Sequence, residues 1–110
     1  MLEKEFVELV LTCGTREEAE KITQVLLEKR LIACAKFVAI DCKYWWEGKI
    51  TDAKEVMLFM ESIATNFEKV EAELEKIHSY DTFILKALPM THVSKKAQDW
   101  LINELGQSTL

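Results

Sequence analysis

Three side chains in the stretch "IHSYD" could bind a metal ion. His78, Tyr80 and Asp81 offer one imidazole nitrogen and two kinds of oxygen, a partial shell that suits Cu²⁺ or another divalent cation. The other histidine, His92, has no histidine or cysteine four residues later with which to chelate. A second interpretation of His78 stays open, because a histidine in the last turn of a helix is favoured by the helix dipole and by unpaired carbonyls.

The cysteines indicate a reducing compartment. Cys13, Cys34 and Cys42 are odd in number and have no CxxC spacing, so they predict neither a disulfide framework nor a structural zinc site. Cys34 and Cys42 lie too far apart along one predicted strand to form a bridge. We therefore expect free, mostly buried thiols.

The residues that a catalytic site needs are incomplete in this sequence. Gly14 and Arg16 stand before a helix N-terminus that could hold an anion, but the segment is not a glycine-rich loop and the core strands have no asparagine to orient a water. Neither histidine lies near a convincing nucleophile along the chain. We predict that the protein is not an enzyme.

Composition limits the partners. The chain has 110 residues, 49% of them apolar, and a formal net charge of −5, which fits a single domain spanning 1–110. The negative charge argues against nucleic acid and against an anionic membrane surface. No apolar run is long enough to span a membrane, and charged residues interrupt any N-terminal signal-like segment. The expected location is cytoplasmic.

The first half of the chain predicts strand, helix and strand. Residues 5–12 are rich in aliphatic and β-branched side chains, as in a buried strand. Thr15 and Glu18 form a capping box that opens a helix over 16–30. The apolar face of that helix contains Ala19, Ile22, Val25 and Leu26. A second strand is expected over 31–45.

The pattern then repeats. A turn at Gly48 leads into a strand over 50–63, and Thr65 with Glu68 forms a second capping box. The helix that follows has one apolar face, made of Phe67, Val70, Leu74 and Ile77. A fourth strand is predicted over 82–90, with Pro89 restricting it to an edge or an end. A last helix begins at Ser94 and stops near Gly106, with Ala97, Trp100, Leu101 and Leu105 on one side.

This order predicts an α+β fold. Two split βαβ units in tandem form a ferredoxin-like plait: a four-stranded antiparallel sheet with two helices on one face, plus a C-terminal helix. The strands at 31–45 and 50–63 have about 14 residues each, roughly 45 Å of extended chain, and so overhang the two shorter strands.

Aromatic side chains gather at the end of this long central hairpin. Tyr44, Trp45 and Trp46 stand there beside unpaired strand edges, which invite another chain. We expect identical subunits to exchange hairpins in a closed ring with these aromatics at the boundary. The alternative is that the two tryptophans fold back on their own subunit.

These segments resemble the CutA family, which is named for divalent-cation tolerance. "LLEKRLIACAKFVAIDCKYWWEGKI" is similar to the family's "L.E.LAAC.N….S.Y.W.G.I", "EKIHSYDTFI" to its "HPYExPE" motif, and "QDWL" to its closing "Y…WL". The resemblance implies a ferredoxin-like homotrimer whose hairpins pair between subunits. This chain departs from the HPYExPE motif at Ser79, Asp81, Phe83 and Ile84.

The resemblance also implies a function. Some family members are thought to bind copper through the motif histidine and a cysteine near the end of the first strand. Carried over, this gives a metal site of His78, Asp81 and Cys13, although Leu11 stands at the family cysteine's own position. We therefore expect a trimeric protein of divalent metal ion (copper) tolerance that binds cations weakly and has no tightly bound cofactor. The alternative is a trimeric sensor or scaffold for a small molecule or anion, without a metal function.

Overall fold

A computed structural model of the chain describes residues 5–106. Its helices and strands are β1 (Phe6–Cys13), α1 (Arg16–Glu28), β2 (Cys34–Trp46), β3 (Lys49–Ile63), the 3₁₀ turn η1 (Ala64–Asn66), α2 (Phe67–Ile77), β4 (Leu85–Pro89) and α3 (Lys95–Glu104). No helix in this described part of the chain is long and apolar enough to span a membrane.

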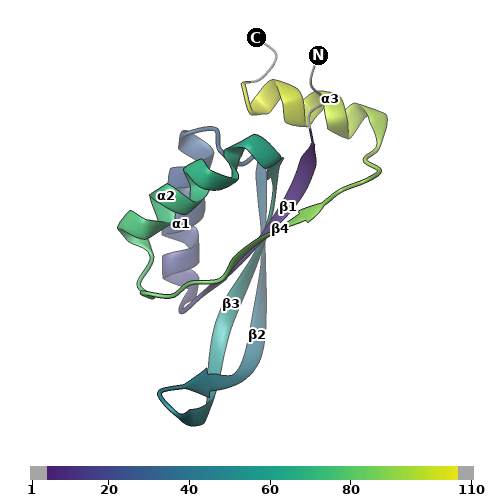
Figure 1. The fold of residues 1–110 in the computed structure, drawn as a ribbon. Helices are drawn as coiled ribbons and strands as arrows, with labels where there is room; N and C mark the ends of the chain where they lie inside the picture. Colours follow the sequence, from purple (N-terminus) through teal and green to yellow (C-terminus); the bar gives the residue numbers. More distant parts are fainter. Residues whose placement is uncertain (1–4, 107–110) are drawn as a thin grey trace.

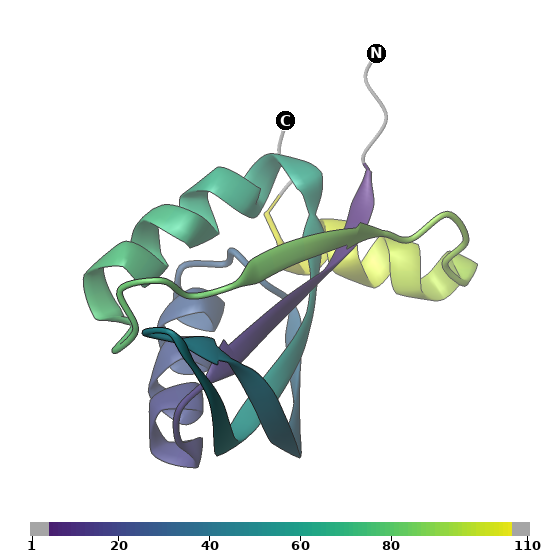
Figure 2. The ribbon, with the colours of Figure 1, turned by 60° about the horizontal axis from the view of Figure 1, so that its bottom comes forward.

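The four strands form one antiparallel sheet in the order β2-β3-β1-β4. Helices α1 and α2 lie beside each other against one face of this sheet, and α3 lies at the end away from the hairpin (Figures 1 and 2). This arrangement confirms the predicted ferredoxin-like plait. Pro89 is the last residue of β4, an edge strand, as its missing N–H group requires.

The main core lies between the sheet and the two helices. It is made of apolar side chains that alternate along β1 and β3 and recur along one face of each helix. Its fully buried members include Leu9, Leu11, Ile22, Leu26, Leu58, Met60, Val70 and Leu74. The predicted face of α2 is confirmed, since Phe67 and Ile77 also pack against this core.

Helix α1 ends earlier than predicted, and β2 begins later. The chain leaves the helix through a Schellman motif: Leu31 N–H donates to Leu26 O at 2.9 Å and Arg30 N–H to Leu27 O at 3.0 Å. Arg30 has φ of 58°, a conformation usually given to glycine. Leu31 and Ile32 then enter the core without joining the sheet, so β2 starts at Cys34.

The second predicted capping box is wrong. The 3₁₀ turn η1 places Thr65 inside a helical path, and the residue at the N-cap position of α2, Asn66, makes no capping hydrogen bond with its side chain. Asn66 is buried instead, and its amide donates to Leu31 O at 3.2 Å and to Ser62 Oγ at 3.3 Å. The predicted fourth strand is also too long, because pairing with β1 begins only at Leu85.

The central hairpin extends well beyond the rest of the sheet, as predicted. Strand β1 pairs with β3 from Val56 to Ile63 only, so residues 40–55 form an overhang that no other strand of the described chain accompanies. Glu47 and Gly48 connect the strands with φ of 50° and 78°, the signs of a type I′ turn. The described chain is elongated, 48 × 26 × 22 Å, and Figure 1 shows the overhang as its lower end.

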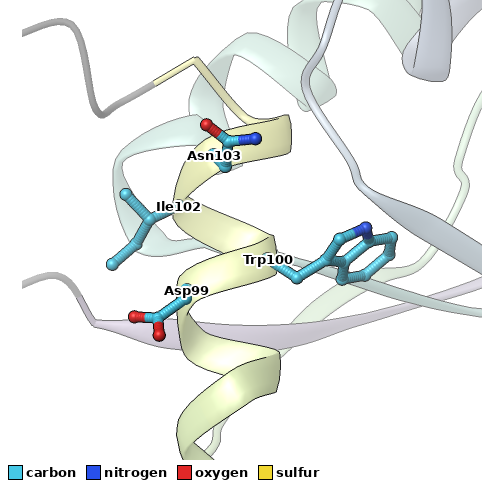
Figure 3. A pocket seen from close by; sticks show the side chains of 4 residues that line it. All are labelled: Asp99, Trp100, Ile102 and Asn103. Atoms are coloured by element: carbon cyan, nitrogen blue, oxygen red, sulfur yellow. The ribbon is translucent and has the colours of Figure 1, made fainter.

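Helix α3 closes the opposite end of the molecule. Leu101 and Leu105 pack against Ile63 with Phe6, Ala33, Met90 and Val93 around them. Trp100 was expected on the same packed side but is 45% exposed, which corrects that prediction. Figure 3 shows its indole beside a surface hollow that Asp99, Trp100, Ile102 and Asn103 line.

Candidate functional site

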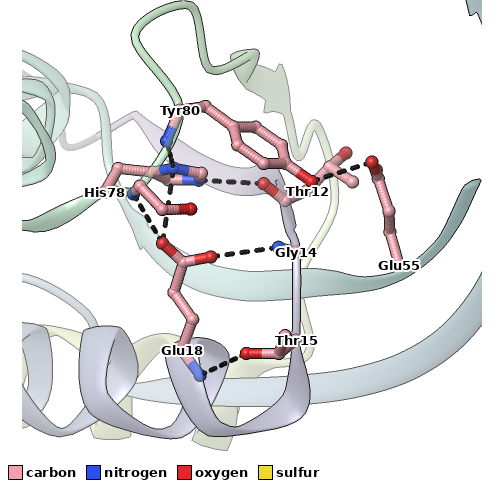
Figure 4. Close-up of polar contacts among 8 residues, drawn as sticks. Thr12, Gly14, Thr15, Glu18, Glu55, His78 and Tyr80 are labelled. Atoms are coloured by element: carbon pink, nitrogen blue, oxygen red, sulfur yellow. Dashed lines mark hydrogen bonds and ion pairs between the residues drawn. The ribbon is translucent and has the colours of Figure 1, made fainter.

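Polar side chains and backbone groups from five segments meet where β1 ends. We call this group the β1-end cluster; it consists of Thr12, Cys13, Gly14, Glu18, Cys42, Glu55, His78, Ser79 and Tyr80 (Figure 4 shows most of it). The loop after α2 brings His78, Ser79 and Tyr80, α1 brings Glu18, and β3 brings Glu55. The cluster includes two residues of the predicted metal site, His78 and Cys13.

His78 uses both of its ring nitrogens within the protein. Nε2 lies 3.0 Å from Thr12 O, and Nδ1 accepts a hydrogen bond from Tyr80 N–H at 3.0 Å. Because a carbonyl only accepts and an amide N–H only donates, these contacts define a neutral imidazole with its hydrogen on Nε2. The side chain is 0% exposed and lies against the rings of Tyr80 and Phe83.

The capping interpretation of His78 is therefore wrong for its side chain. Only the backbone N–H of His78 bonds to the helix, donating to Leu74 O at 2.8 Å, while the ring reaches across to β1. The imidazole thus fastens the loop after α2 to the end of β1, and its contacts leave no ring nitrogen for a cation. In this structure both ring nitrogens of His78 are used to hold the loop in place.

Glu18 connects the same loop to the start of α1. Its carboxylate accepts from Gly14 N–H at 3.0 Å and from Ser79 N–H at 2.6 Å, and one oxygen lies 3.6 Å from His78 Nδ1. Burial alone would raise the pKa of this carboxyl, but the hydrogen bonds from Ser79 and Gly14 outweigh it and lower the pKa. Thr15 Oγ1 accepts from Glu18 N–H at 3.1 Å, so the first predicted capping hydrogen bond is confirmed.

Tyr80 and Glu55 join the cluster to the base of the overhang. Tyr80 Oη donates to Glu55 at 2.8 Å, and Cys42 Sγ lies 3.4 Å from the other oxygen of that carboxylate. Burial, together with the hydrogen bond to Glu55, raises the pKa of the Tyr80 phenol. A Cβ at Gly14 would lie 3.2 Å from Tyr80 Oη, so glycine lets the phenol pack closely over the end of β1.

The structure does not assemble the predicted metal site. Among residues 5–106, no three or more His, Cys, Asp or Glu side chains form a group that could hold a metal ion. Asp81 is exposed, and Cys13 is buried with a thiol whose pKa is raised to about 12, chiefly by burial and next by Glu18 and Glu55. Thiolate is the form that binds metals, so this environment disfavours Cys13 as a ligand.

The N-terminus of α1 is already occupied. The Glu18 carboxylate takes the N–H of Gly14, and Arg16 pairs with Glu20 at 3.1 Å and stacks over Phe37 at 4.5 Å. A carboxylate at this position repels a bound anion. The Gly14–Arg16 segment is therefore a closed helix start and not a phosphate site.

The hairpin aromatics are exposed, and they lie on two faces of the overhang. Because side chains alternate along a strand, Ile40, Cys42, Tyr44 and Trp46 share one face, while Trp45 pairs with Ile50 on the other. Tyr44 is 39% exposed, Trp45 71% and Trp46 52%, so they do not fold back on the described chain.

The apolar face of the overhang continues the helix-free face of the main sheet. We call the joint surface the open sheet face; it comprises Val10, Val38, Ile40, Tyr44, Trp46, Met57, Phe59 and Leu88. Val38 and Leu88 are 44% and 46% exposed, respectively. On the opposite face, the overhang has the ion pairs Lys43–Asp52 at 2.6 Å and Lys54–Asp41 at 2.8 Å.

Sequence reasoning missed the central role of Glu18 and Glu55. Glu18 gave a signal, since it stands at the third position of a capping box, but that pattern says nothing of Ser79 or His78. The sequence around Glu55 gave almost no signal of its role. An acidic residue at the start of an apolar strand segment is a weak hint of a buried polar contact, and Tyr80 is far from it along the chain.

Comparisons with known proteins agree with one another. The family model described as CutA1 divalent ion tolerance protein matches residues 7–104. A divalent-cation tolerance protein CutA of Archaeoglobus fulgidus is 37% identical over 93 residues, covering 84% of this chain and 91% of the relative. A chloroplastic protein CutA of Arabidopsis thaliana is 31% identical over 94 residues, covering 84% of this chain and 52% of the relative.

Solved structures match as closely. The structure of a protein described as the periplasmic divalent cation tolerance protein CutA from Archaeoglobus fulgidus has a TM-score of 0.89 at 34% identity, covering 91% of this chain and 98% of the other. CutA1 from Pyrococcus horikoshii has a TM-score of 0.86 at 32% identity, covering 89% and 96%.

Proposed function

Because the chain belongs to the CutA1 divalent ion tolerance family, we propose that it acts as a homotrimer in the response to divalent metal ions, copper foremost. The trimer follows from the family resemblance of the hairpin sequence. The observation that carries this proposal is the open sheet face, which continues from the sheet onto an overhang where Tyr44 and Trp46 are exposed on the described chain.

The chemistry of this face favours a second copy of the chain as its cover. Exposed Tyr44, Trp46, Val38 and Leu88 provide apolar area of the kind that is buried at the centre of homo-oligomer interfaces. The outer edge of β2 adds a row of unpaired backbone groups along its 13 residues, which another strand edge can satisfy. The opposite face of the overhang has two ion pairs and, at its tip, the exposed side chains of Trp45 and Ile50.

Sedimentation equilibrium tests the assembly. We expect about three times the chain mass of 12.7 kDa at micromolar concentration. Trp46→Ala should weaken assembly by orders of magnitude in the dissociation constant, because truncating a large buried aromatic costs about 3–5 kcal/mol. Leu27→Ala is the control, since Leu27 is also exposed but lies on α1, away from the open sheet face. A wild-type monomer, or equal effects of the two changes, would refute the proposal.

Cation binding within this proposal is weak. Cu²⁺ heads the affinity order of divalent metals for nitrogen, oxygen and sulfur ligands, so it is the ion that we expect the protein to bind first. His78 has both nitrogens engaged, so we expect His78→Ala to bind Cu²⁺ as wild type does.

A thermal-shift screen with Cu²⁺, Zn²⁺, adenine nucleotides and citrate separates this function from that of an anion or nucleotide sensor. Stabilisation by the divalent ions alone is expected, because a ligand that binds only the native state raises its melting temperature. Stabilisation by a nucleotide or citrate and not by the metals would favour the sensor. The occupied start of α1 argues against a phosphate ligand at that point.

We also propose a reducing, cytoplasmic location and no catalytic turnover. Cys13, Cys34 and Cys42 are all free, which is the usual state of thiols in the cytosol. Relatives are described as periplasmic and as chloroplastic, so the location differs within the family. The side chains of the β1-end cluster hydrogen-bond to one another and to the backbone, an arrangement that suits a structural role.

A further inference from the structure

The imidazole of His78 faces two alternative partners at one nitrogen. Nδ1 accepts from Tyr80 N–H at 3.0 Å, and the Glu18 carboxylate lies on the same side at 3.6 Å. A neutral ring that donates its Nε2–H to Thr12 O can use only the first partner, because its Nδ1 is then an acceptor. A protonated ring has hydrogens on both nitrogens and can use only the second.

We propose that His78 is a proton-operated switch that exchanges Tyr80 N–H for the Glu18 carboxylate and so controls the base of the hairpin overhang. The proton comes from solvent and binds Nδ1. The Nε2–H contact to Thr12 O is the same in both states and serves as the pivot of the ring. The inference depends only on contacts within one chain and is independent of the proposed trimer.

The groups that surround His78 favour an exchange of partners at Nδ1 over local unfolding of the loop after α2. Glu18 faces it from α1 and Tyr80 from its own loop, and the other titratable groups of the β1-end cluster are Cys13 on β1, Cys42 on β2 and Glu55 on β3. The Glu18 carboxylate lies 3.6 Å from Nδ1, where it can pair with a hydrogen gained at that nitrogen. Because the His78 side chain is 0% exposed, proton uptake requires the loop after α2 to open for a moment.

Tyr80 transmits the exchange to the hairpin. Its backbone N–H is the group that loses its acceptor, and its phenol is the group that holds Glu55 at 2.8 Å. Glu55 lies where β3 separates from β1, opposite Ile40 of β2. Displacement of Tyr80 therefore breaks the hydrogen bond between its phenol and Glu55, where the overhang begins.

The chain contains only two histidines, which makes the switch directly observable. In protein labelled with ¹⁵N-histidine, NMR across falling pH should show His78 change from the neutral Nε2–H form to imidazolium. The Tyr80 amide should lose at least tenfold of its hydrogen-exchange protection in the same transition. His92, which is exposed and whose Nδ1 lies 3.2 Å from Thr91 Oγ1, is the internal control, and a change in its NMR signal should leave the Tyr80 amide unchanged.

Two variants test the mechanism. Glu18→Gln should move the His78 transition to lower pH, because the carboxylate that stabilises imidazolium is gone. In the wild type, the Glu55 amide signal should also shift in this transition, because Tyr80 Oη bonds to Glu55. Tyr80→Phe should keep the ring transition but remove this shift, because the phenolic hydroxyl is lost. The proposal is overturned if the Tyr80 amide keeps its protection when the ring is charged, or if the ring stays neutral until the whole chain unfolds.

Discussion

At the scale of single residues, Glu18 contributes more than its place in a helix start requires. One carboxylate joins Gly14 at the end of β1 and Ser79 in the loop after α2, two segments far apart in the sequence. Both donors are backbone N–H groups that would otherwise lack an acceptor near the end of a strand and a helix. Hydrogen bonds to a charged group are the stronger kind.

We expect Glu18→Gln to reduce the free energy of unfolding by about 1.5–3 kcal/mol at pH 7. Because the pKa of Glu18 is lowered in the native state, its contribution is present above the ordinary value of 4.5 and is lost as pH falls through the native pKa. The difference between variant and wild type should therefore shrink below pH 4.5. Urea unfolding across this range measures it, at one fixed protein concentration.

Glu17→Gln is the matched control, since Glu17 is exposed in the same first turn of α1. It should change stability little at any pH in the series. A Glu18→Gln effect that stays constant down to the acid limit would contradict the assigned role of the carboxylate.

At the scale of elements, the order of the helices and strands and the apolar face of α2 followed from the sequence, while several ends and the place of Trp100 on α3 did not. The spacing of apolar residues predicted α1, because the side chains that recur at helical spacing are the ones that pack in the core. Its end was missed because Arg30, not glycine, takes the left-handed position. The second capping box failed because Asn66 is drawn into the core by Leu31, a contact between distant segments that no local pattern contains.

The same reasoning explains the candidate site. His78 and Cys13 were found to lie near each other, but their roles depend on Thr12, Glu18 and Tyr80, which only the folded chain brings together. Residue types predicted a partial ligand set. The hydrogen bonds that satisfy those groups internally are a property of the fold.

The hairpin turn gives a prediction at this scale. Gly48 has φ of 78° with open space around it, so Gly48→Ala carries a purely conformational cost of about 1–2 kcal/mol. Glu47→Gly should have the opposite sign, because Glu47 has φ of 50° and glycine adopts this region freely. Chemical unfolding of both variants checks the pair; a stabilising Gly48→Ala would exclude the type I′ turn.

At the scale of the whole molecule, one face of the sheet is covered by helices and the other is not. The helices close one face of the sheet, and α3 closes the end away from the hairpin. On the described chain, Val38 and Leu88 of the open sheet face and the aromatic tip of the overhang remain exposed. A domain of this size buries only about two-thirds of its unfolded surface, so covering this face would add much to its stability.

The unpaired outer edge of β2 also has a kinetic consequence, because two processes compete for it. A newly made chain passes through a stage as a folded single copy, when the outer edge of β2 and the hairpin aromatics are available to any exposed strand. Assembly of the proposed trimer would depend on collisions and slow on dilution, while off-pathway pairing with other unfolded chains would compete for the same edge. The Lys43–Asp52 and Lys54–Asp41 pairs place charges on one face of the overhang, where they act as gatekeepers that leave a single face for pairing. The protein's yield in a cell is then governed as much by the rate of its own encounters as by the stability of each chain.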